Sequence, residues 1–167
     1  KLCDAVADTI VGYFQESDPF AQCGIEGACV FDQMVVTGRA ATPSAEAREA
    51  FRLGRDDMVR NVYASAGYGR DAAGYKWIPL PAELKIQWML CCGPFAQDER
   101  ELRHLSDDQA ICVGYALRSP QTDYLPPAHW LARRIGQELA RLRRDVGEGQ
   151  IGPDGKVIVN GVRTGRG

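Results

Sequence analysis

Apolar side chains return every three to four positions in three stretches of the chain, and this spacing predicts three amphipathic helices. The first helix is predicted over 2–16, and its repeat is made by Leu2, Val6, Ile10 and Phe14. The second is opened by Thr42-Pro43-Ser44, with the threonine or the serine as its cap, and continues to about Ala64. The third covers 128–144 and follows two prolines, a residue that a first helical turn tolerates.

Other stretches have the short apolar or alternating patterns that strands require. Residues 22–39 predict two strands with a turn near Phe31-Asp32-Gln33. Residues 84–90 alternate apolar and polar positions, as a half-buried strand does. Residues 110–116 are nearly all apolar, which predicts a strand buried on both faces. A last strand is predicted over 156–160.

The order is helix, two strands, helix, two strands, helix, strand. This order predicts a two-layer α/β sandwich, with a mixed sheet and helices on one of its faces. Something else must then cover the other face of the sheet. The 167 residues suffice for one domain with a real core, and they contain no internal repeat, low-complexity segment or linker. We therefore expect a single region over 1–167.

Charge and composition exclude several classes of function. A formal net charge of −2 gives no basic footprint for nucleic acid. No apolar run approaches the roughly 20 residues of a membrane span, and the first residues lack a signal peptide's layout. The six cysteines form no CxxC pair, which argues against zinc, and most lie in apolar runs. We expect a cytoplasmic protein that does not contact a membrane, with its cysteines buried as small hydrophobic residues.

Three acidic positions are candidates for chemistry, and each has a plainer interpretation. Asp108 lies in a charged stretch, 97–108, that reads as a solvated loop before the apolar strand. Asp154 and Lys156 flank a glycine in a segment that also suits a hairpin turn. Glu26 lies among apolar and small residues, where a carboxylate is costly to bury unless it is paired or binds a metal. A solvent-facing glutamate on an edge strand is the alternative.

Three segments of the chain resemble S-adenosylmethionine synthetases. They are KLCDAVADTI (1–10), DDQAICVGYALRSPQTDYLPP (107–127) and GPDGKVIV (152–159). The resemblance covers nearly all of the chain but less than half of a usual subunit of that family. It implies an N-terminal domain followed by the start of a central domain. It also implies a transferase that makes S-adenosylmethionine from ATP and methionine, with magnesium and potassium as cofactors.

The resemblance assigns roles to the candidates. Asp108 matches the aspartate of the family's GAGDQG loop, which implies contact with methionine or the nucleoside. In the family's RPDxK segment, Asp154 would bind the nucleoside and Lys156 the polyphosphate. Glu26 would lie near a monovalent cation, potassium. Lys1 matches the lysine of GHPDK, whose histidine and magnesium-binding aspartate would precede residue 1.

Two positions depart from the family pattern. Arg39 stands where the family has a glutamate that holds the methionine amino group, and an arginine attracts carboxylate or phosphate instead. Phe95 replaces a glutamine and offers a ring for adenine to stack on, but no amide.

The resemblance implies an active site shared between chains. We expect the open sheet face to pack on a second synthetase-like chain, so that this chain is one subunit of a synthetase oligomer. The alternative is a non-catalytic subunit that regulates or stabilises a synthetase complex. A third interpretation, a structural or other binding role, makes the matched residues turns and surface charges.

Overall fold

The computed structural model describes residues 1–70, 74, 76–99, 114–145 and 151–161. The chain forms two compact units. One consists of Lys1–Arg70 with Lys76–Gln109, and the other of Asp71–Tyr75 with Ala110–Gly167. The expectation of one synthetase-like region that holds an N-terminal domain and the start of the next stays a prediction.

The first unit is built on a three-stranded mixed sheet. β1 (Gln22–Val30) and β2 (Gln33–Ala41) form an antiparallel hairpin, and β5 (Lys85–Gly93) pairs parallel with β2. The hairpin turns through Phe31 and Asp32, in the stretch where the turn was predicted. The Asp32 carboxylate lies 2.8 Å from Lys85 Nζ, which ties this turn to the start of β5.

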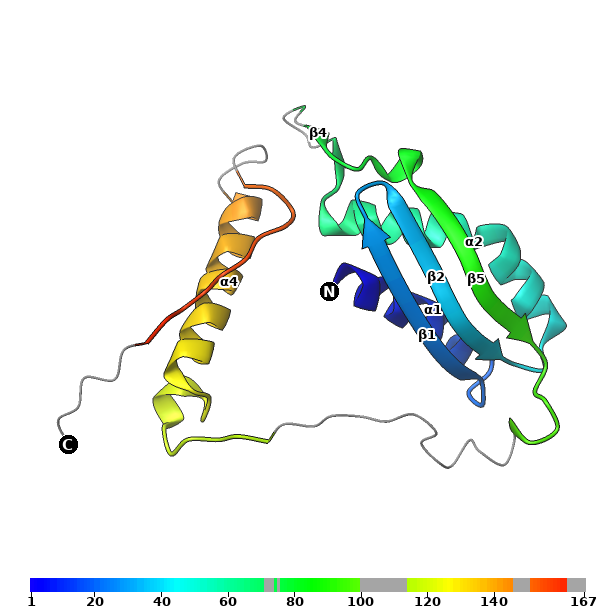
Figure 1. Ribbon diagram of the computed structural model, residues 1–167, viewed down its shortest axis with the longest axis horizontal. Coiled ribbons are helices and arrows are strands. Elements are labelled where there is room, and N and C mark those ends of the chain that lie inside the picture. The colour runs from blue at the N-terminus through cyan, green and yellow to red at the C-terminus, as the bar shows by residue number, and fades with distance from the viewer. Residues whose placement is uncertain (71–73, 75, 100–113, 146–150, 162–167) are drawn as a thin grey trace. The chain divides into compact units, whose positions relative to one another are not determined.

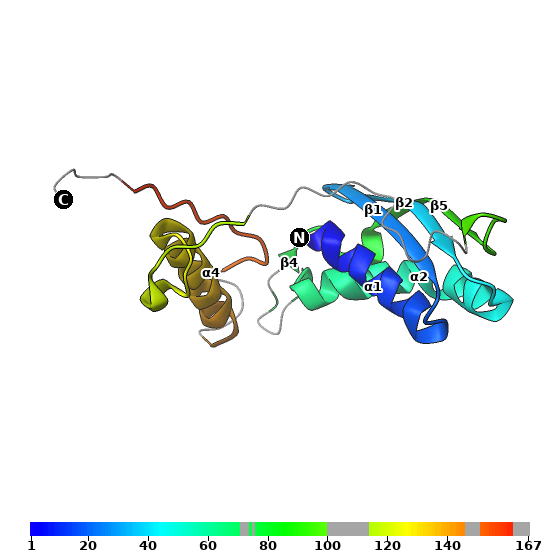
Figure 2. The same cartoon turned by 90° about the horizontal axis from the view of Figure 1, so that it is seen from below.

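Two helices cover one face of the sheet, as Figure 1 and Figure 2 show. They are α1 (Leu2–Ser17) and α2 (Ala45–Ala66). The Oγ of Ser44 accepts a hydrogen bond from the Ala47 backbone N–H at 3.1 Å, so the cap of the second helix is Ser44, one of the two residues predicted for it. The two-layer α/β arrangement, with a mixed sheet and helices on one face, is confirmed for this unit.

The core lies between the helices and the sheet face that they cover. Its strand residues are led by Met34, Val36 and Ala40 of β2, which are fully buried. The rings of Phe14 and Phe51 pack with their centroids 4.9 Å apart, and Phe51 meets Trp88 edge to face. Because β2 is the middle strand, its inward side chains have neighbours on β1 and β5 as well as on the two helices.

The opposite face of the sheet, here called the open face, is exposed in the described part of this unit. Glu26, Thr37 and Met89 are cross-strand neighbours and form one row across it. All three are exposed, and Met89 shows 68% of its surface. The packing of this face on a partner stays a prediction.

A short hairpin follows α2, in a stretch where the sequence predicts a loop because it contains Gly67, Gly69 and Gly74. It pairs β3 (Gly69–Arg70) with β4 (Lys76–Trp77), and a single 3-10 turn, η1 (Pro81–Glu83), precedes β5. Strands of two residues are too short to produce a detectable alternation, which is why the sequence did not predict them.

The second unit contains the third predicted helix. α4 (Pro127–Asp145) follows the 3-10 turn η2 (Pro120–Thr122). Its apolar side chains Leu131, Ile135 and Leu139 remain 38–43% exposed. Residues 156–160 form no strand, and neither do 114–116 of the other strand predicted here, so both predictions are wrong for the described residues. A strand needs a hydrogen-bonding neighbour, which no alternation of side chains can supply.

In the part of the chain that the structure describes, no helix is long and apolar enough to cross a bilayer.

Candidate functional site

Arg39 is the centre of a polar cluster at one end of the open face. It lies near the end of β2, between Gly24 of β1 and Cys91 of β5. Its Nε and Nη2 donate to the two carboxylate oxygens of Glu99, with Nη2 2.8 Å from Oε2. Nη2 also donates to the carbonyl of Pro94 at 2.9 Å, and Nη1 donates to Cys91 Sγ at 3.2 Å. The carboxylate that Arg39 attracts in this structure therefore belongs to the chain itself.

Glu99 fastens the segment after β5 onto the end of the sheet. Its side chain also accepts a hydrogen bond from the Ala96 backbone N–H, and its backbone carbonyl accepts one from Gln22 Nε2 at 2.8 Å. These donors, the Arg39 guanidinium first and the Ala96 amide second, lower the pKa of Glu99 from 4.5 to about 2. The pKa of Arg39 is raised by the same pair. Both side chains are held in their charged forms.

The backbone beside Arg39 requires a glycine. Gly38 has a φ of 118°, and a Cβ atom there would lie 2.0 Å from the carbonyl oxygen of Gly24 on β1. No side chain fits that approach, so the two strands can close around this point only with a glycine at 38. The same close approach fixes the position in β2 from which the side chain of the next residue, Arg39, projects.

Two other predicted site residues belong to the same end or face. Phe95 is half-buried in the segment that Glu99 holds, one residue after Pro94. Glu26 is exposed midway along the edge strand β1, opposite Thr37, which is two residues before Arg39 on β2. The structure thus places Arg39 and Phe95 in one cluster, with Glu26 on the adjoining surface.

Lys1 lies at the other end of the sheet. It precedes α1, whose first turn contacts the end of β1 through Cys3 and Cys29, whereas Arg39 pairs with the start of β1. Figure 1 shows the N-terminus beside the tip of the β1 arrow. The Lys1 side chain is exposed, and the chain's amino group lies 3.3 Å from the Asp4 carboxylate. One chain therefore does not bring Lys1 and Arg39 together.

The remaining predicted site residues lie elsewhere. Asp154 and Lys156 are exposed in the second unit, in a segment without regular secondary structure. Asp108 falls outside the residues that the structure describes. The roles of all seven predicted residues stay predictions.

None of the five described cysteines is fully buried, so their expected burial is wrong; Cys112 lies outside the described residues. Cys29 and Cys91 are exposed, while Cys3, Cys23 and Cys92 are half-buried. Cys91 follows the inward-facing Leu90 in a strand, and the alternation of side chains turns it to the open face. An apolar run in the sequence therefore did not mean burial of every member.

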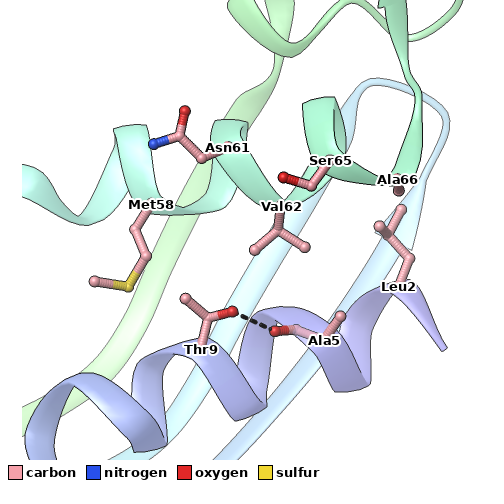
Figure 3. Close-up of a pocket in the computed structure, with 8 residues that line it drawn as sticks. All are labelled: Leu2, Ala5, Thr9, Met58, Asn61, Val62, Ser65 and Ala66. Atoms are coloured by element: carbon pink, nitrogen blue, oxygen red, sulfur yellow. Dashed lines mark hydrogen bonds between the residues drawn. The ribbon is translucent and has the colours of Figure 1, made fainter. Parts of the chain in front are cut away.

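A groove between α1 and α2 does not suit the predicted substrates. It has a volume of about 530 Å³ and is lined by Leu2, Ala5, Thr9, Met58, Asn61, Val62, Ser65 and Ala66. Figure 3 shows Met58 and Val62 of α2 pointing toward α1, with the Thr9 hydroxyl donating to the Ala5 carbonyl. No lining side chain carries a charge, so the groove has no cation for a polyphosphate.

Glu99 and Gln22 are the members of the Arg39 cluster that sequence analysis missed. Glu99 lies in the charged stretch 97–108, which was interpreted as a solvated loop, yet its side chain is only 20% exposed. The signal in the sequence that could have indicated an acidic partner was Arg39 itself, because the guanidinium of an arginine on a strand is stabilised by a nearby anion. No pattern in the sequence distinguishes Glu99 from the other acidic residues that could supply one.

Comparisons with known proteins identify relatives over nearly the whole chain. No family model matches. A curated S-adenosylmethionine synthase from Maricaulis maris is 31% identical over 99% of this chain and 42% of its own length. One from Brachyspira hyodysenteriae is 26% identical over 93% of this chain and 40% of its own length. The chain thus spans about two fifths of the curated relatives that it matches.

A solved structure supports the fold. An unusual S-adenosylmethionine synthetase from Campylobacter jejuni superposes with a TM-score of 0.59 over 87% of this chain and 35% of its own. The sequence identity is 19%, so this likeness bears on the fold alone. The curated relatives confirm the resemblance, because S-adenosylmethionine synthases match this chain over nearly all of its own length.

Proposed function

We propose that this chain is a subunit of an S-adenosylmethionine synthetase whose active site it shares with a partner chain. The observation that carries the proposal is the match to S-adenosylmethionine synthases over nearly the whole chain. The enzyme would form S-adenosylmethionine, phosphate and pyrophosphate from ATP, methionine and water.

The reaction asks the protein mainly for positioning and charge. The methionine sulfur attacks the ribose 5′ carbon of ATP, the bond from that carbon to oxygen breaks, and triphosphate leaves. Water then splits the triphosphate into pyrophosphate and phosphate. In this proposal Lys1 and Lys156 neutralise phosphates, while Asp108 and Asp154 orient the substrates. Phe95 offers its ring to the adenine.

The described residues do not form a metal site by themselves. They contain no group of three or more histidine, cysteine, aspartate or glutamate side chains that could hold an ion. Glu26 would supply a single carboxylate, whereas a magnesium or potassium ion needs further oxygen ligands.

The sharing of the site is supported by the positions of Lys1 and Arg39. They lie at opposite ends of the β1–β2 ladder, and the open face between them is exposed. A second sheet packed face to face with its strands reversed would set the Lys1 end of one chain over the Arg39 end of the other. That arrangement also covers Met89 and its row.

The first test is an activity assay on this chain alone and mixed with a longer synthetase-like chain. We expect S-adenosylmethionine to form only in the mixture. Lys156→Ala and Asp108→Ala should each lower the rate by about 100-fold, the typical effect of removing a group that stabilises the transition state. Lys76→Ala is the matched control, because Lys76 is an exposed lysine of the first unit. If the mixture forms S-adenosylmethionine at an unchanged rate with Lys156→Ala and with Asp108→Ala, the shared site is contradicted.

A non-catalytic regulatory or stabilising subunit is the second candidate, and the Arg39 cluster favours it. The guanidinium already holds an internal carboxylate, a carbonyl and a sulfur, so a methionine or phosphate group would have to displace Glu99. Arg39 would then be a structural residue rather than a substrate-binding one.

A charge swap separates the two candidates at this position. Arg39→Glu alone breaks the ion pair, whereas Arg39→Glu with Glu99→Arg rebuilds it with the charges exchanged. If Arg39 only fastens the segment 94–99, the double variant recovers both thermal stability and the activity of the mixture. If Arg39 binds substrate, the double variant recovers stability but its KM for methionine or ATP stays raised.

A further inference from the structure

The Arg39 guanidinium is oriented to bind a carboxylate. Its Nε and Nη2 donate to the two oxygens of the Glu99 carboxylate, which is the two-point geometry that arginine offers to planar anions. Nη1 donates to Cys91 Sγ and Nη2 to the Pro94 carbonyl, so protein atoms other than Glu99 also fix the guanidinium. A carboxylate that replaced Glu99 would therefore meet an arginine that is already in position.

Glu99 reaches Arg39 from outside the sheet and is held there by side chains. Its carboxylate binds Arg39 and the Ala96 N–H, and its backbone carbonyl accepts a hydrogen bond from Gln22 Nε2 at 2.8 Å. These contacts tie Glu99 to β1 and β2 through the side chains of Gln22 and Arg39, and not through a strand ladder. A partly exposed ion pair contributes little to stability, so a carboxylate from another molecule can compete with Glu99 for Arg39.

Open space lies beside Arg39 on the open face. Gly24 is the cross-strand neighbour of Arg39 on β1, and it is exposed. In the described part of the chain, a Cβ atom at Gly24 would have no contact within 4 Å. The Arg39 side chain itself is 35% exposed. A small ligand can therefore approach the guanidinium from the β1 side without moving a strand.

We propose that Arg39 is a binding site for the carboxylate of a small ligand, and that Glu99 is an internal stand-in that keeps this site closed until the ligand displaces it. When the ligand carboxylate takes the place of Glu99, the hydrogen bond from the Ala96 N–H to Glu99 is lost as well. Binding of the ligand and release of Glu99 from the sheet are therefore one event. The proposal rests on the geometry around Arg39 and not on the proposed enzyme activity.

Competition with Glu99 sets the apparent affinity of this site. Glu99 belongs to the same chain, so its effective concentration near Arg39 is high. An external carboxylate binds only the fraction of molecules in which Glu99 has left the guanidinium. Removing the Glu99 carboxylate removes the competitor, so Glu99→Ala should bind a small carboxylate more tightly than the wild-type chain does. A Glu99 that only fastens the segment 94–99 predicts no such gain.

The test is a titration of the full chain with sodium acetate, with sodium chloride at equal ionic strength as the reference. The NMR signals of the Gly24 and Cys91 backbone amides report on binding, because these residues flank Arg39. We expect saturable shifts with a Kd about tenfold or more lower in Glu99→Ala than in wild type. Glu99→Gln keeps the shape of the side chain without its charge and should lie between them. In wild type, exchange of the Ala96 amide with solvent should rise as acetate binds.

Two controls assign the binding to Arg39. Arg39→Met combined with Glu99→Ala should abolish the saturable shifts. Glu49→Ala frees Arg52, an exposed arginine on α2, and should create no acetate site there. The proposal is overturned if neither Glu99→Ala nor Glu99→Gln binds acetate better than wild type, or if the double variant still binds it. Saturation by inorganic phosphate but not by acetate would overturn the assignment to a carboxylate. If Glu99→Ala does not fold, the comparison of Glu99→Gln with wild type decides.

Discussion

The two faces of the three-stranded sheet are made by alternate residues of the same strands, yet they differ in what completes them. On the covered face, Met34 and Val36 are fully buried under the two helices. On the open face, Thr37 and Met89 are exposed, and Arg39 is held by a segment that follows the sheet. The first face is completed by elements that the local sequence predicts, and the second by contacts from outside the strands.

The largest expected effect lies in the covered face. Phe51→Ala should lower the free energy of unfolding by about 3–5 kcal/mol, because it leaves a cavity among the rings of Phe14 and Trp88. Leu53→Ala on the same helix is the matched control, since Leu53 is 70% exposed. It should change that free energy by less than about 0.5 kcal/mol. Urea titration measures both, and equal losses would mean that the two positions are packed alike.

The second effect tests the close approach of β1 and β2. Gly38→Ala should cost about 1–3 kcal/mol of unfolding free energy for the unfavourable φ alone, and more for the contact with the Gly24 carbonyl. Gly54→Ala should have the opposite sign and stabilise by about 0.5–1 kcal/mol, because Gly54 lies within α2 and has open space around its Cα. A neutral Gly38→Ala would show that the strands can separate at this point without loss.

The third effect concerns the pair that completes the end of the open face. Glu99→Gln should lower the free energy of unfolding by about 1 kcal/mol at neutral pH, since it removes a charge-assisted, partly buried hydrogen bond. Glu49→Gln, which breaks an exposed pair with Arg52 on α2, should cost less than about 0.5 kcal/mol. A loss in Glu99→Gln no larger than in Glu49→Gln would mean that the cluster does not hold the segment.

The same pair predicts a dependence of stability on pH. The pKa of Glu99 is lowered from 4.5 to about 2 in the folded chain, so its contribution is complete above about pH 4.5 and is lost as the pH falls toward 2. The difference in stability between the wild-type chain and Glu99→Gln should therefore shrink over that interval. A difference that stays constant from pH 5 to pH 2.5 would contradict the assignment of this shift to the Arg39 pair.

The two faces also differ in how much of their structure could be predicted from the sequence. Period-four and period-two spacing predicted α1, α2 and the alternation of Ile86, Trp88 and Leu90, because burial against a neighbouring layer leaves that trace in each segment. The pairing of Arg39 with Glu99 joins residues 60 apart in the sequence and leaves no such trace. The predicted strand over 156–160 failed for a related reason, since an apolar segment becomes a strand only beside another strand.

The smallest effect on stability decides what the open face is for. Met89→Lys places a charge on an exposed position of the Glu26–Thr37–Met89 row and should leave the free energy of unfolding of the isolated chain within about 0.5 kcal/mol of wild type. In the proposed complex the same row is buried against a second sheet, where an unpaired lysine is costly. The variant should therefore weaken association with the partner chain about tenfold or more, as measured by analytical ultracentrifugation. If association is unchanged while Phe51→Ala still destabilises the chain, the open face faces solvent in the complex, and the partner must approach this chain from another side.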